Sequence, residues 1–197
     1  MKMRKIFVVS VFLLISSFVY AAPFGLEMGM TIEEIAQECE DYPAFVEDGI
    51  YLVTPLKKHP LFSTYAVYVH ENVGLYQIRA LSDFITCNRY GTELQNAFNN
   101  VKDRVAKTYG NPRVINKVDP AISSFLQEDE YWFRTLREGS RQLSAIWGEK
   151  VELADGLVSV ALDCVAESGY SDGRGRLVLY YYFSNAQSVE DEQDEVF

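Results

Sequence analysis

The feature that most constrains the fold is a helix-then-strands order that occurs twice along the chain. A short helix is predicted to begin at Thr31, which forms a capping box with Glu34, and strand-like runs of alternating residues follow it. A long stretch with apolar residues at helical spacing, 92–109, then precedes further alternating runs. Helices followed by runs of strands are typical of an antiparallel sheet rather than of alternating βαβ units. We therefore predict an α+β fold of two tandem helix-plus-antiparallel-sheet units, with the helices packed on one face of the sheet.

The first unit is expected to span residues 22–86 and the second residues 87–185. The acidic cluster 190–195 repels itself and offers little apolar surface to bury, so residues 186–197 are predicted to form a disordered acidic tail. The expected elements are helices over 31–39, 92–109 and 128–138 and strands over 51–55, 63–71, 75–84, 141–147, 157–167 and 176–184.

The amino terminus has the layout of a cleaved signal peptide. Basic residues within the first five positions precede the uncharged run 6–20, and small or medium residues stand before the junction between Ala21 and Ala22. The alternative is a membrane anchor, but a spanning helix needs about 20 apolar residues and this run is shorter. We predict that residues 1–21 are removed and that the mature protein is periplasmic or secreted in a bacterium, and not an integral membrane protein.

The charge of the chain disfavours several classes of partner. The leader carries three basic residues and no acidic one, so its removal takes the formal net charge from −10 to −13. Such a field repels nucleic acids and anionic lipid surfaces. Neither is expected as a partner.

The chain has three cysteines, Cys39, Cys87 and Cys164. An oxidising compartment allows one pair to form a disulfide, and the sequence leaves open which pair, if any, does so. Cys39 lies on a helical apolar stripe and Cys164 on an alternating apolar face, so both are predicted to be small core residues. No Cys-x-x-Cys motif occurs, which argues against thioredoxin-type chemistry.

No catalytic, metal or cofactor site is predicted. The two histidines, His59 and His70, have no second ligand at metal-binding spacing, and no Gly-x-Ser-x-Gly motif is present. His59 stands in a basic turn and is expected to be solvated. Carboxylates are abundant, which leaves a paired-acid site open without pointing to one. The chain is therefore predicted not to be an enzyme.

The aromatic residues near the end of the second unit suggest a contact surface. Alternation over 177–184 places Tyr180 and Tyr182 on one face of a strand and Tyr181 and Phe183 on the other. Tyrosine and tryptophan are common anchors at interfaces, so Trp132, Tyr180 and Tyr182 form the candidate contact surface. The alternative is that these side chains cover and rigidify the sheet.

Several motifs resemble those of known exported proteins. Residues 29–35, which read Gly-Met-Thr-x-x-Glu-Ile, are similar to the start of the SmpA/OmlA domain of outer-membrane assembly lipoproteins. The doubled helix-then-strands order resembles β-lactamase-inhibitory protein. Segments 24–31, 74–78 and 109–112 resemble a group of uncharacterised exported bacterial proteins. Members of the two named families act by binding other proteins, so the resemblance implies a binding module.

The expected function is accordingly that of an exported, non-catalytic protein that binds another protein in the cell envelope. Two alternatives remain open at this point. One is a hydrolase that acts on envelope material through an unrecognised site, and the other is a carrier of a small ligand on the aromatic face.

Overall fold

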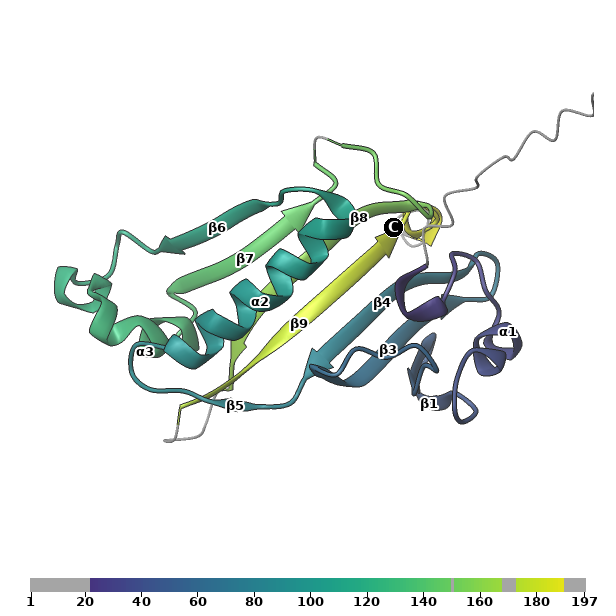
Figure 1. The fold of residues 1–197 in the computed structure, drawn as a ribbon, viewed down its shortest axis with the longest axis horizontal. Helices are drawn as coiled ribbons and strands as arrows, with labels where there is room; N and C mark the ends of the chain where they lie inside the picture. Colours follow the sequence, from purple (N-terminus) through teal and green to yellow (C-terminus); the bar gives the residue numbers. More distant parts are fainter. Residues whose placement is uncertain (1–21, 150, 168–172, 190–197) are drawn as a thin grey trace, which may run out of the picture.

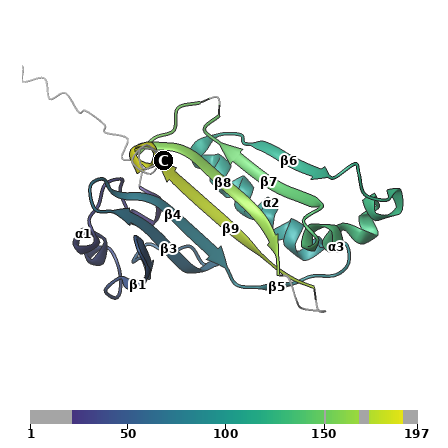
Figure 2. The same cartoon turned by 180° about the vertical axis from the view of Figure 1, so that it is seen from behind.

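The computed structural model describes residues 22–149, 151–167 and 173–189 (Figure 1). One nine-stranded antiparallel sheet has the order β1-β2-β3-β4-β9-β8-β7-β6, and β5 pairs with β9 outside this path. The helices α2 and α3 lie across one face of the sheet, in front of it in Figure 1 and behind it in Figure 2. The predicted α+β class with an antiparallel sheet is therefore confirmed. The strands form one continuous sheet.

The described elements follow one another in a simple order. They are η1 (Pro23–Gly25), α1 (Ile32–Gln37), β1 (Ala44–Glu47), β2 (Ile50–Val53), β3 (Phe62–His70), β4 (Gly74–Ser82), β5 (Ile85–Thr86), α2 (Thr92–Tyr109), β6 (Arg113–Val118), η2 (Ser124–Gln127), η3 (Asp129–Tyr131), α3 (Trp132–Arg137), β7 (Arg141–Trp147), β8 (Leu157–Ala166) and β9 (Arg174–Phe183).

Parts of the sequence-based expectations fall outside this description. The predicted signal peptide 1–21, with its cleavage residue Ala21, and residues 190–197 of the predicted tail lie outside the described residues. Residues 186–189 of that tail are described, and they are helical. The Val189 side chain is 5% exposed, so apolar burial carries the ordered chain beyond Ala186, where the tail was expected to begin.

The capping box predicts the start of α1 correctly. The Thr31 hydroxyl accepts a hydrogen bond from the Glu34 backbone N–H at 3.3 Å, and the Glu34 carboxylate accepts one from the Thr31 N–H at 2.8 Å. Two orphan N–H groups of the first turn are thereby satisfied. The helix buries Ile35 and ends at Gln37, two residues before the expected end.

The two edge strands of the sheet, β1 and β6, were not predicted. Every residue of β1 is exposed and β6 is mostly exposed, so neither shows the apolar alternation that marks a half-buried strand. The turn residues Asp48-Gly49 between β1 and β2 were the available signal, because Asp-Gly favours a hairpin. Gly49 adopts the required left-handed conformation, with φ of 73°.

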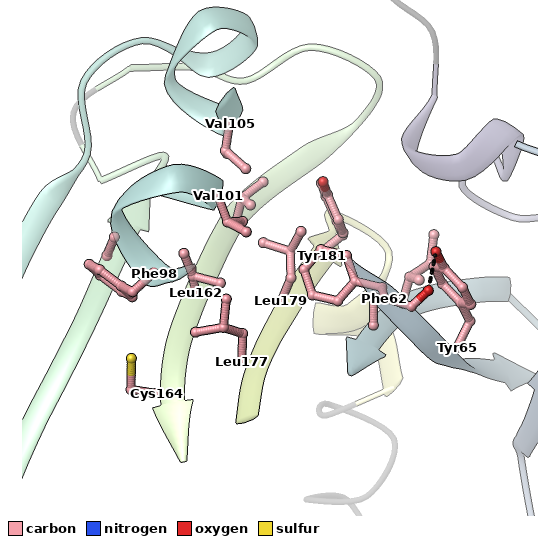
Figure 3. Close-up of a cluster of buried hydrophobic side chains, with 14 of the residues drawn as sticks. Phe62, Tyr65, Phe98, Val101, Val105, Leu162, Cys164, Leu177, Leu179 and Tyr181 are labelled. Atoms are coloured by element: carbon pink, nitrogen blue, oxygen red, sulfur yellow. Dashed lines mark hydrogen bonds between the residues drawn. The ribbon is translucent and has the colours of Figure 1, made fainter. Parts of the chain in front are cut away.

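The hydrophobic core beneath α2 lies between this helix and strands β8 and β9 (Figure 3). One face of the sheet is therefore covered by α2 and α3, and the opposite face is free of these two helices. The side chains that α2 contributes are Leu94, Phe98, Val101 and Val105. The strand residues that share this cluster include Leu162, Cys164, Leu177 and Leu179.

Candidate functional site

Figure 2 shows the sheet from the face opposite α2 and α3, which we call the open face, with β9 near its centre. The side chains of Tyr181 and Phe183 are 7% and 0% exposed and belong to the core. Tyr180 and Tyr182 alternate with them and are partly exposed, so the period of two places their side chains on the open face. The alternation expected for this strand is present.

Four side chains form a connected group on the open face, which we call the aromatic cluster: Tyr68, Arg79, Tyr180 and Tyr182. The Arg79 guanidinium carbon lies 5.0 Å from the centre of the Tyr68 ring and 5.1 Å from that of Tyr180. Tyr180 and Tyr182 stack with their ring centres 6.0 Å apart and an angle of 11° between the rings. Cation–π contact and stacking therefore hold three strands' side chains in one arrangement.

The polar atoms of the aromatic cluster are not all satisfied. Within the described part of the chain, Nε of Arg79 is buried and has no hydrogen-bond partner. Burial raises the pKa of both Tyr180 and Tyr182, and their neutral hydroxyls can donate and accept hydrogen bonds. A buried donor without a partner is uncommon in native proteins, so Arg79 is distinctive among the side chains of this face.

The strand register gives the open face a basic character. Arg79, Lys117 and Arg176 lie on this face, and so does Arg113, which pairs with the Glu149 carboxylate. The acidic residues that the strand register places on the face are Asp163, in β8, and Glu47, in the edge strand β1. Because the whole chain has a formal net charge of −10, this face contrasts with the rest of the molecule. It is therefore suited to an acidic surface.

Trp132, the third residue of the predicted contact surface, does not belong to it. Its side chain is 2% exposed and lies at the start of α3, on the covered side of the sheet. A methyl group added at Gly91 would come within 2.1 Å of the Trp132 ring, and the Arg141 guanidinium stands 6.0 Å from the centre of that ring. The prediction was wrong because the local sequence of a short helix does not show whether an aromatic side chain faces the solvent or the core.

All three cysteines are free and buried. Burial raises the pKa of the Cys39, Cys87 and Cys164 thiols, most strongly for Cys164, which lies under α2. A thiol of raised pKa carries little thiolate at neutral pH and reacts slowly. Cys39 and Cys164 are core residues, as their spacing predicted, and Cys87 joins them.

We expect the native protein to react with Ellman's reagent many-fold more slowly than a free cysteine does. Unfolding in guanidinium should then expose three reactive thiols per chain. Rapid reaction of one thiol in the native protein would contradict the burial described above. Fewer than three thiols after unfolding would reveal a disulfide in the purified protein.

Each of the two histidines accepts a hydrogen bond from a nearby backbone N–H. His59 Nδ1 accepts a hydrogen bond from the Leu61 N–H, and His70 Nδ1 accepts one from the Asn72 N–H. No group of three or more His, Cys, Asp or Glu side chains suited to a metal occurs among the described residues. Burial, with a smaller contribution from Arg104, lowers the pKa of His59, so this side chain is less solvated than its turn suggested.

His59 also lines a hollow that sequence reasoning missed. This hollow has a volume of about 320 Å³ and lies between α2 and the segment that contains η1. Its walls come from residues 22–25, 57–62 and 101–109, and β9 forms its floor. No single stretch of the sequence carries a signal for such a site, because each segment contributes only a few side chains.

The fold and these surfaces define a class: a mixed α+β protein whose one antiparallel sheet has a helix-covered face and an open, aromatic face. A scan against protein-family models finds no match to this chain, and comparisons with curated proteins and with solved structures find none either. In the described parts of the chain, no helix has the length and apolar character needed to cross a membrane.

Proposed function

We propose that this protein is an exported, non-catalytic module that binds another protein through the open face of its sheet. The observation that carries the proposal is the aromatic cluster, in which tyrosine rings and the Arg79 guanidinium are held in place but remain accessible. Aromatic and arginine side chains are the residue types that most often anchor protein interfaces. A rigid arrangement of this kind loses little side-chain freedom when a partner binds.

The charge of the open face favours a partner with an acidic contact surface. Arg79 has an unpartnered Nε, and Lys117 and Arg176 add positive charge on the same face. A carboxylate of the partner would accept a charge-assisted hydrogen bond from the terminal nitrogens of the Arg79 guanidinium, which are not buried as Nε is. The basic face on an acidic chain would also orient the two proteins as they meet.

The proposed compartment is the periplasm or the extracellular space, with the partner in the cell envelope. The layout of residues 1–21 supports this, because a basic start, an uncharged run and small residues at the junction are typical of an exported protein. The resemblance of residues 29–35 to the SmpA/OmlA domain favours the same compartment and the same class of function.

We further propose that residues 22–86 and 87–185 are two tandem units. The order of the sheet supports this: one run of four strands, β1 to β4, meets a second run, β6 to β9, at the antiparallel pair β4–β9. A helix precedes each run, α1 in the first and α2 in the second. Two units related by a two-fold axis between β4 and β9 would give this order.

The proposal is tested by site-specific photo-crosslinking in the native host. A photoreactive phenylalanine analogue at Tyr182 should crosslink to one defined envelope protein, and the same analogue at Tyr42, which is 67% exposed elsewhere, should not. With that protein purified, replacing Tyr180 and Tyr182 by serine should weaken binding by about 30-fold or more, because an anchor residue is often worth about 2 kcal/mol.

The matched control replaces exposed tyrosines outside the open face, Tyr42 and Tyr90, by serine. This control should bind as the wild type does, and both double variants should remain folded. Equal weakening by the two double variants would place the interface elsewhere. Absence of any crosslinked protein from Tyr182 would refute binding through the open face.

A further inference from the structure

The covered side of the sheet contains a hollow that the proposed function does not use. This hollow, of about 320 Å³, opens between α2 and the segment that contains η1. Figure 3 shows part of its floor, where Leu179 and Tyr181 of β9 lie below Val101 and Val105 of α2. It is separated from the aromatic cluster by the thickness of the sheet.

The interior of the hollow is apolar. The side chains of Phe62, Val101 and Leu179 line it, and each is no more than 5% exposed to solvent. Tyr109 and Tyr181 add aromatic rings, and burial raises the pKa of Tyr109 to about 12, so its phenol stays neutral. An apolar lining with few polar groups is typical of small-molecule sites.

The mouth of the hollow is basic. Lys57, His59 and Arg104 line it, and no acidic side chain is among the described residues that do so. Arg104 donates a hydrogen bond to Asn100 at 2.9 Å, and among the described residues it has no carboxylate partner. In a chain with 28 acidic and 18 basic residues, two cations at one opening, Lys57 and Arg104, are a specific feature, and the Glu38 carboxylate approaches this opening only on the side of Lys57.

His59 and Arg104 stand between two neighbouring hollows. A second depression of about 460 Å³ shares His59 and Arg104 with the first and continues along α2 past Asn96 and Asn100. Lys57 is on the other side, where its ammonium group and the Glu38 carboxylate both approach Gly25. Arg104 is therefore the cation most accessible from both hollows.

We propose that this hollow binds a small amphiphile with a carboxylate head and one unbranched apolar chain. The carboxylate would pair with Arg104 and Lys57 at the mouth, and the chain would lie against Leu179, Val101 and Phe62. The basic mouth selects the charge of the head, because a charge-assisted hydrogen bond to guanidinium is stronger than a neutral one. The apolar floor selects the tail, because burying its surface is favourable.

The volume limits the length of the chain. A hollow of about 320 Å³ holds about ten water volumes of roughly 30 Å³ each, so about ten non-hydrogen atoms fit inside. Decanoate is therefore a suitable probe, with its head at the mouth and its chain inside.

Titration calorimetry of the purified full protein with decanoate, below its micelle concentration, tests the proposal. We expect saturable binding of one decanoate per chain. Decanol, which lacks the charge, should bind at least about tenfold more weakly, because hydrogen bonds to a charged group are worth about 1.5–3 kcal/mol, that is about tenfold or more. Decyltrimethylammonium should not bind at this site.

Four variants locate the site. Arg104→Gln should weaken decanoate binding by about tenfold or more, whereas Lys107→Gln, on the same helix but outside the hollow, should leave it unchanged. Thr108→Trp places a large ring at an exposed position of the rim and should abolish binding without loss of folding. The Tyr180/Tyr182 double serine variant should bind decanoate as the wild type does.

Each contrary result overturns a defined part of the proposal. No saturable decanoate binding would rule out the ligand class. Equal binding of decanoate and decanol would show that the basic mouth does not select the head. Unchanged binding by both Arg104→Gln and Thr108→Trp would show that decanoate binds elsewhere, and in that case the hollow is not the site.

Discussion

Replacing Phe183 by alanine is expected to lower the free energy of unfolding by about 3–5 kcal/mol, the usual cost of removing a large aromatic side chain from a packed core. Phe183 ends β9 and is 0% exposed, so removing the ring leaves a cavity in the packed core. The measurement is equilibrium unfolding in urea, followed by circular dichroism.

The adjacent residue provides the control for Phe183. Tyr182 points to the open face, is partly exposed and stacks on Tyr180, so Tyr182→Ala should cost only about 1 kcal/mol or less, as expected for a side-chain pair on a sheet surface. Equal losses for the two variants would mean that the open face is covered. A larger loss for Tyr182→Ala would mean that the two faces of β9 are reversed.

The alternation along β9 could be predicted from the sequence because strand geometry repeats every two residues. The sequence did not show which face the helices would cover, because that depends on α2, whose contacts with Leu177 and Leu179 join residues far apart in the chain. Trp132 shows the same limit. Its helix was expected, but its ring packs closely against Gly91, about 40 residues earlier, a contact that the local sequence does not show.

The edge strands and the hollow were missed for related reasons. An edge strand such as β6 buries little, so its sequence lacks the apolar alternation by which half-buried strands are recognised. The hollow depends on Arg104, Lys57 and Leu179, which come from three elements that only tertiary packing brings together. The sequence was sufficient to predict features that depend on residue types at fixed spacing within one segment, such as the capping box of α1.

One close contact links the segment before α1 to the hairpin between β3 and β4, and it depends on Gly74. The Gly29 N–H donates to the Leu75 carbonyl at 2.9 Å, and the Leu75 N–H donates to the Met30 carbonyl at 2.8 Å. The two backbones approach so closely that a Cβ on Gly74 would lie 2.1 Å from the Gly29 carbonyl oxygen. Gly74 also has φ of 70°, a conformation that favours glycine.

Gly74→Ala is therefore expected to lower the free energy of unfolding by about 3 kcal/mol or more. The left-handed conformation alone costs an alanine about 1–2 kcal/mol, and forcing a methyl group into a packed site typically adds about 1–3 kcal/mol. The collision is with backbone, which cannot rotate away as a side chain can.

Gly139→Ala is the matched control, because Gly139 has φ of 74° and nothing within 4 Å of the added Cβ. It should lose only about 1–2 kcal/mol, the cost of the backbone conformation. Urea unfolding of both variants measures the difference, and equal losses would show that the two backbones can separate without cost.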